Sequence, residues 1–194
     1  DNIFVTCPRG LEESLSYEIT AILGKKPSID SGGVHVKGGL DYIYKLNLET
    51  RTSMLVLQEI TRFKSSGIED LYKKVKSLPW HKLISSSDTF SIRTKINSRL
   101  FERSNFLTLK VKDAIIDRIR QETQARPSIN KEDPTYPIFL NIKDDRVIIY
   151  LNTSGPALYK RGYRGRVHRA SLNPSLAAGM VLLSNWDMES PFYD

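Results

Sequence analysis

Strand-like and helix-like segments alternate along this chain with short connections, and that order limits the folds it can adopt. In the first third, apolar residues recur at every second position or at helical spacing over Asn2–Cys7, Gly10–Leu23, Val34–Lys37, Leu40–Glu49 and Met54–Phe63. A period of two is typical of strands and a period of 3.6 of helices. The resulting β-α-β-α-β order predicts a small α/β sandwich.

A second α/β unit follows the polar and small residues of Lys64–Gly67. Apolar and polar residues alternate along Phe90–Asn97, and the clearest helical stripe in the chain lies within Phe106–Thr123. Two further alternating runs within Ile138–Leu151, with a pair of aspartates between them, predict a hairpin with one buried face.

The segment Leu172–Trp186 differs because apolar residues surround the predicted helix instead of forming a stripe along it. Asn173 suits the N-cap position and Pro174 the first helical position. A helix that is apolar nearly all round is buried, so it either packs on the preceding domains or is covered by residues beyond Asp194. We favour the second arrangement and expect this chain to be part of a longer one.

These patterns predict an α+β fold in three parts. The element order of the first unit indicates a ferredoxin-like domain over residues 1–64. An α/β domain with a helical linker at its start takes residues 65–160, and a basic connector leads into the terminal helix over residues 161–194.

Leu158–Arg169 is a densely basic stretch that contains no acidic residue and interleaves its cations with Tyr159 and Tyr163. Cations at this density repel one another, so a polyanion would stabilise them, and tyrosines could stack on bases. The alternative is a solvated basic loop, which is what most charge runs are. The formal net charge of +7 also favours nucleic acid or an anionic surface as the partner.

No catalytic or metal-binding constellation can be found in the sequence. Three scattered histidines and the single cysteine, Cys7, do not supply a zinc site, and neither a P-loop nor a GxGxxG motif is present. Cys7 lies near Arg9 and could act as a nucleophile, but we favour a buried strand cysteine. One cysteine suits a reducing compartment, and without a long apolar run or a leader we expect a cytoplasmic protein.

Seven short strings, taken in order, resemble one family. They are TCPRGLEE at Thr6–Glu13, GGVHVKG at Gly32–Gly38, the run Tyr44–Leu57 with its N-L-x-x-R-T, LPW at Leu78–Trp80, VKDAIIDRIR at Val111–Arg120, RPSI at Arg126–Ile129 and LYKRGYR at Leu158–Arg164. The ordered set, above all RPS followed by LYKRGYR, carries the resemblance. It is similar to the N-terminal part of bacterial-type large-subunit (23S) rRNA guanine-N2 methyltransferases, often labelled N6-adenine-specific DNA methylases.

The resemblance implies a ferredoxin-like domain, then a THUMP domain, which is an RNA-binding module, and then a Rossmann-like methyltransferase domain that binds S-adenosylmethionine. The helix Leu172–Trp186 resembles the first helix of that last domain. Asp194 matches the first residue of the family's cofactor loop, D-P-x-C-G-S-G-T, whereas the rest of the loop and the later N/D-P-P-Y motif do not occur in this sequence. We therefore expect no cofactor and no methylation for this chain alone, and S-adenosylmethionine as the cofactor of the parent protein.

One departure from the family concerns the border of the cofactor pocket. The family usually reads A-P-L-K-E where this chain reads Ala170-Ser171-Leu172-Asn173-Pro174. The missing lysine and glutamate leave Ser171 and Asn173, together with Asp194, as the candidates for cofactor contacts in the parent protein.

The RNA-binding hypothesis joins the basic run to the second unit. Arg93 and Lys95 share the exposed face of their strand, and further cations would extend that face into a track for phosphates. Tyr163 would either stack on a base or pack under its loop. The full set of candidates is Arg93, Lys95, Lys112, Arg126, Lys160, Arg161, Tyr163, Arg164, Arg166 and Arg169. The expected partner is structured RNA, which the resemblance implies is large-subunit rRNA, with no membrane or metal involved.

Three other functions stay open. The chain could be a stand-alone THUMP-type adaptor that presents tRNA to another enzyme. It could be a ferredoxin-like domain that binds a small ligand or another protein, which would predict an apolar pocket or a free sheet edge instead of a positive surface. The customary label of the family also suggests a fragment of a DNA adenine methylase.

Overall fold

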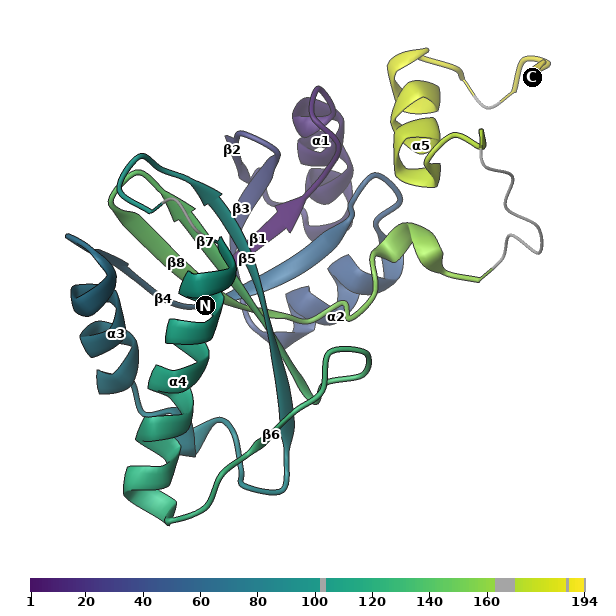
Figure 1. Ribbon diagram of the computed structural model, residues 1–194. Helices are drawn as coiled ribbons and strands as arrows, with labels where there is room; N and C mark the ends of the chain where they lie inside the picture. The colour runs from purple at the N-terminus through teal and green to yellow at the C-terminus, as the bar shows by residue number, and fades with distance from the viewer. Residues whose placement is uncertain (102–103, 163–169, 188, 194) are drawn as a thin grey trace. The chain divides into compact units, whose positions relative to one another are not determined.

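The computed structural model describes residues 1–101, 104–162, 170–187 and 189–193 (Figure 1). The chain forms two compact units. The first consists of Asp1–Gln58 and Thr153–Asp194, and the second of Glu59–Asn152. One strand, β4 (Leu55–Lys64), begins in the first unit and ends in the second. The expected domain limits at residues 64 and 160 stay predictions.

The first unit has the ferredoxin-like order β-α-β-β-α-β and the strand order β2-β3-β1-β4, with antiparallel neighbours. Its elements are β1 (Asn2–Thr6), α1 (Glu12–Leu23), β2 (Ser28–Asp30), β3 (Gly33–Lys37), α2 (Leu40–Glu49) and the first part of β4. Apolar residues of β1, β3 and β4 pack against Leu15 and Ile19 of α1 and against Ile43 and Leu46 of α2. The predicted α+β fold with a ferredoxin-like first domain is therefore confirmed.

Strand β2 is the element of this unit that the sequence pattern does not predict. Its three residues are all exposed, so no alternation of apolar and polar side chains marks it. Backbone pairing with β3, from Ser28 opposite His35 to Asp30 opposite Gly33, holds it at the edge of the sheet. Such an edge strand is defined by its neighbour's backbone and not by its own side chains.

The second unit has the strand order β4-β8-β7-β5-β6. Its elements are α3 (Ile68–Ser77), β5 (Thr89–Asn97), α4 (Ser104–Thr123), β6 (Ser128–Ile129), β7 (Tyr136–Lys143) and β8 (Arg146–Asn152). Strands β5 and β7 are parallel and are joined through α4, while β7 and β8 form the predicted antiparallel hairpin. Parallel neighbours require such a crossover, whereas antiparallel neighbours need only a tight turn.

The core of the second unit lies between one face of this sheet and helices α3 and α4 (Figure 1). Leu107, Val111 and Ile115 of α4 are buried there, as the helical stripe predicts. The indole Nε1 of buried Trp80 donates to the carbonyl oxygen of Val75 at 2.8 Å, which satisfies its polar atom inside the core.

The terminal helix α5 (Pro174–Leu183) packs on the first unit through small residues. Its N-cap is the predicted Asn173, whose side-chain oxygen accepts from the backbone N–H of Ser175 at 2.9 Å. Gly179 lies so close to Leu11 that an added Cβ would sit 2.4 Å from a Leu11 methyl group. The helix therefore packs on the preceding part of the chain, while Met180 and Leu183 remain 55% and 58% exposed. Cover by residues beyond Asp194 stays a prediction. No helix in the described ranges combines the length and apolarity that a membrane span requires.

Candidate functional site

Two of the predicted RNA contacts, Arg93 and Lys95, lie on the exposed side of β5. The residues that flank this pair, Ile92 and Ile96, pack on the opposite side against the core of the second unit. Side chains two apart on a strand point the same way, so the two cations share one face of the sheet.

Sequence reasoning missed two cations of the same sheet, Lys143 at the end of β7 and Arg146 at the start of β8. These residues are directly opposite one another in the hairpin, and both are exposed. The sequence pattern does indicate that both residues point away from the core. They flank the predicted turn at Asp144 and are out of phase with the apolar residues that point into the core.

Lys112 and Arg126 do not join this face. Lys112 belongs to α4, and its ammonium lies 3.1 Å from the Asp113 carboxylate. Arg126 follows α4 and lines a shallow polar cavity of about 370 Å³ with residues of α3 and α4, among them Tyr72 and Asp117. Within the second unit the predicted cations therefore form two groups, one on the free face of the sheet and one beside the helices.

The cavity beside the helices contains a tyrosine–carboxylate pair. The Tyr72 hydroxyl donates to the Asp117 carboxylate, and this hydrogen bond, together with burial, raises the pKa of Tyr72 to about 12. The ammonium of Lys110 lies 5.9 Å from the centre of the Tyr72 ring. With carboxylates of Asp113 and Asp117 among its lining, this cavity is a poorer phosphate site than a surface with cations alone.

Arg161, in the first unit, donates its side-chain hydrogen bonds to backbone carbonyls at the end of α2. Its guanidinium donates to the carbonyl oxygens of Asn47 at 2.8 Å, of Leu48 at 2.9 Å and of Thr50 at 2.9 Å. The last carbonyls of a helix have no partner inside it, so Arg161 caps the C-terminus of α2. The structure thereby gives Arg161 a role in stability that the basic run did not suggest.

The remaining candidates of the basic run lie outside the described residues. They are Tyr163, Arg164, Arg166 and Arg169, and the same holds for the cofactor candidate Asp194.

The cofactor candidates Ser171 and Asn173 line a cavity of about 450 Å³ in the first unit together with Lys160. The rest of the described lining is Tyr159, Gly162, Leu172 and Pro174. This volume is within the range of small-molecule sites. The structure thus brings one predicted RNA contact, Lys160, beside two predicted cofactor contacts.

These lining residues do not fit a complete site for S-adenosylmethionine. The ammonium and the ribose hydroxyls of that cofactor need carboxylates or other acceptors, and no Asp or Glu is among the described lining residues. The side-chain oxygen of Asn173 already accepts the N-cap hydrogen bond of α5. These residues could supply at most one wall of a cofactor pocket.

Cys7 is buried directly after β1, as expected for a structural cysteine. Burial, and to a lesser extent the nearby Glu12 carboxylate, raises the pKa of Cys7 to about 12. Its thiol is therefore protonated at neutral pH and is a poor nucleophile. In the described parts of the chain, no group of three His, Cys, Asp or Glu side chains is placed to hold a metal ion.

Three domain families match consecutive parts of the chain. The RlmL ferredoxin-like domain matches residues 2–57, the THUMP domain residues 65–152, and an RMKL-like methyltransferase domain residues 161–194. The resemblance identified in the sequence is confirmed, and so is the predicted succession of a ferredoxin-like domain and a THUMP domain.

Curated relatives and solved structures agree with these matches. A ribosomal RNA large subunit methyltransferase K/L from Syntrophotalea carbinolica is 32% identical over 183 residues, which are 94% of this chain and 26% of that protein. The crystal structure of a predicted N6-adenine-specific DNA methylase from Listeria monocytogenes has 28% sequence identity and a TM-score of 0.86, over 100% of this chain and 50% of that one.

A further solved structure is SMU.472, described as a methyltransferase complexed with SAH. It has 25% sequence identity and a TM-score of 0.84, and it covers 98% of this chain and 50% of that chain. The chain thus spans 26% of the length of the first curated relative and half the length of these solved chains.

Proposed function

We propose that this chain, which contains RlmL ferredoxin-like and THUMP domains and a segment of an RMKL-like methyltransferase domain, is the RNA-binding region of a large-subunit rRNA methyltransferase. The observation that supports it best is the THUMP match over residues 65–152, in which Arg93 and Lys95 stand exposed on one face of the sheet. In the proposal, this region holds structured RNA while a catalytic domain further along the parent chain modifies one base.

We further propose that the parent enzyme uses S-adenosylmethionine and methylates N2 of a guanine. The cofactor part is supported by the methyltransferase names of the relatives and by the SAH complex of SMU.472. Ser171, Asn173 and Asp194 would border the cofactor, with Lys160 close by. Because rRNA is the proposed ligand, the protein would work in the cytoplasm.

Binding of RNA by this chain is tested with overlapping transcripts of large-subunit rRNA, titrated at several salt concentrations. If about four cations neutralise phosphates, the affinity should fall on the order of a hundredfold over a fourfold rise in salt. Duplex DNA of matching sequence serves as the competitor. Preferential displacement by DNA would favour the DNA methylase alternative, and absence of RNA binding at low salt would refute the proposal.

The reaction is tested on the parent protein, with rRNA from cells that lack its gene as the substrate. We expect transfer of a methyl group from S-adenosylmethionine to one guanine, detected as N2-methylguanosine by mass spectrometry of nuclease digests. A methyl group on adenine N6 would overturn the guanine assignment but leave RNA binding by this chain intact. The 194-residue chain should give no product.

A further inference from the structure

We propose that one sheet face of the second unit, made by Arg93, Lys95, Lys143 and Arg146, grips the phosphate backbone of the RNA. We call it the four-cation face. This inference rests on the proposed function and goes further by naming the surface and the residues that bind. It places the binding of RNA phosphates on the sheet of the THUMP domain and not on its helices.

Strand register brings the four cations together. Lys95 on β5 is opposite Asn141 on β7, and Asn97 is opposite Lys143, which in turn is opposite Arg146 on β8. Directly opposed residues in neighbouring strands lie on the same face, about 5 Å apart. Residues two apart along a strand repeat at about 6.6 Å on that face. The cations therefore form a compact group across three adjacent strands.

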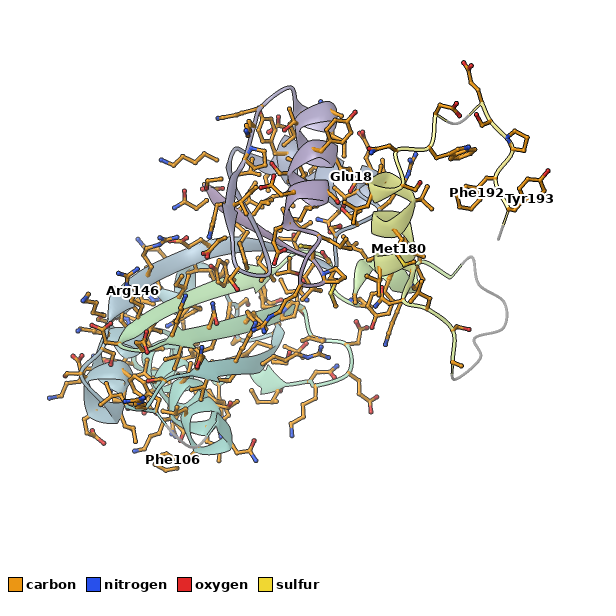
Figure 2. The ribbon with its side chains drawn as sticks, turned by 90° about the horizontal axis from the view of Figure 1, so that it is seen from above. Glu18, Phe106, Arg146, Met180, Phe192 and Tyr193 are labelled. Carbon is orange, nitrogen blue, oxygen red and sulfur yellow. The ribbon has the colours of Figure 1, made fainter. Side chains whose placement is uncertain are left out.

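The opposite face of these strands is apolar and is used by the core. Ile138, Leu140 and Ile142 of β7 and Val147 and Ile149 of β8 are buried there against α3 and α4. In Figure 2 the strands of this unit lie between Arg146 and Phe106, which belongs to α4. The four-cation face is thus the face of the sheet that α3 and α4 leave free.

Across the described residues, none of the four cations forms an ion pair. The nearby Asp145 carboxylate pairs with Lys64 at 2.9 Å, and this hydrogen bond, with a smaller contribution from the charge of Arg146, lowers the pKa of Asp145. The outward positions of the described strands β5, β7 and β8 contain no acidic residue. Like charges on adjacent strands destabilise a sheet, so a bound polyanion would relieve the repulsion. Charge complementarity therefore points to phosphate as the occupant.

Hydrogen bonds to backbone carbonyl oxygens hold the hairpin end in place. The N–H of Asp144 donates to the carbonyl oxygen of Asn97 at 2.9 Å, and the Ser98 hydroxyl donates to the carbonyl oxygen of Asp144 at 2.7 Å. The N–H of Ser65 donates to the carbonyl oxygen of Asp145 at 2.7 Å. Lys143 and Arg146 thus project from a fixed frame, which lowers the entropy cost of binding.

Two amides lie among the cations, Asn97 on β5 and Asn141 on β7. An amide both donates and accepts hydrogen bonds, as does the ribose 2′-hydroxyl that distinguishes RNA from DNA. Cations alone would bind any polyanion, so the amides are what favours RNA. We therefore assign RNA as the occupant.

The test compares two double variants of the full chain that lose equal charge. Lys143→Gln with Arg146→Gln removes half of the four-cation face. Lys73→Gln with Lys82→Gln removes two exposed cations elsewhere in the same unit. Binding of one stem-loop transcript of large-subunit rRNA is measured against salt, and thermal unfolding checks that both variants are folded. We expect the face variant to bind at least about tenfold more weakly, with a salt slope lower by about 2, and the control to stay close to wild type.

The outcomes separate this inference from the function on which it rests. If wild type binds and the face variant binds equally well, the RNA grip lies elsewhere and the inference is overturned, while the proposed function stands. If wild type fails to bind, both are overturned. If the face variant loses affinity equally for the transcript and for DNA of the same sequence, RNA is not the specific occupant, and the assignment to RNA is overturned. Loss of binding to phosphatidylserine vesicles, with RNA binding intact, would reassign the face to membranes and overturn the inference.

Discussion

The Ser175 hydroxyl donates to the carbonyl oxygen of Ser53 at 2.8 Å, and both residues are completely buried. This hydrogen bond joins the start of α5 to the loop before β4. One turn further along, Gly179 packs against Leu11, and Leu176 contacts the core of the first unit. Small residues and one leucine thus fix the helix to this unit.

Gly179→Ala tests how tightly α5 packs. An alanine at an open helix position stabilises by about 1 kcal/mol, but here its Cβ would lie 2.4 Å from a Leu11 methyl group. Leu11 is itself buried and has little room to move, so we expect a net loss of about 1–3 kcal/mol in the free energy of unfolding. Urea denaturation measures it, with exposed Met180→Ala as the control. A stabilised Gly179→Ala protein would show that the contact is loose.

Arg161→Ala should lower stability and leave RNA binding unchanged, because its guanidinium caps α2. Three charge-assisted hydrogen bonds are lost, but the site is mostly exposed to solvent. We therefore expect a loss of about 1 kcal/mol in the free energy of unfolding. Arg161→Lys should not restore it, because one ammonium cannot reproduce the planar fork. A salt slope of RNA binding reduced by about 1 would instead indicate a phosphate contact.

The sequence predicted the elements that have a strong apolar period and missed those that do not. The stripe of Leu107, Val111 and Ile115 gave α4, and the alternation on both sides of Asp144 gave the β7–β8 hairpin. Strand β6 is two residues long and exposed, so only its pairing with β5 defines it. The parallel pairing of β5 with β7 is equally invisible in the sequence, because it depends on tertiary packing over α4.

The candidate site was predicted to a smaller extent, because charge density says nothing about what a cation touches. Arg161 and Lys143 show this in opposite ways. Arg161 lies in the basic run yet bonds to backbone carbonyls, whereas Lys143 lies outside it yet joins Arg146 on the free face of the sheet. Strand parity around the predicted hairpin could have identified Lys143, but the helix-capping geometry of Arg161 could not be foreseen.

Because of the Tyr72–Asp117 hydrogen bond, the free energy of unfolding should fall as the pH rises from 10 to 12. The pKa of Tyr72 is raised from 10.0 to about 12, so the bond contributes fully below pH 10 and is lost as pH rises toward 12. Tyr72→Phe removes the donor and should cost about 1 kcal/mol at pH 8. We expect the difference in free energy of unfolding between wild type and Tyr72→Phe to shrink between pH 10 and pH 12. A difference that stays constant over this range would contradict the assignment.

Cys7 should resist alkylation in the folded protein. The residue is 6% exposed, and burial raises the pKa of its thiol to about 12, so little thiolate is present at pH 8. Iodoacetamide labelling followed by mass spectrometry should give negligible modification without denaturant and complete modification in urea. Rapid labelling of the folded chain would contradict the burial and reopen the nucleophile hypothesis.

The exposed side of α5 separates the behaviour of this chain from that of its proposed parent. Met180 and Leu183 are 55% and 58% exposed, so Met180→Gln with Leu183→Gln should change the free energy of unfolding of this chain by no more than about 0.5 kcal/mol. In the parent, a methyltransferase domain would cover these side chains. Each substitution should then lower the free energy of unfolding of the parent by roughly 1.5–3 kcal/mol. Leu176→Ala is the control that should destabilise both proteins, because Leu176 packs on the core of the first unit. Urea denaturation of both proteins decides it, and equal small effects in chain and parent would mean that nothing in the parent covers this side of α5.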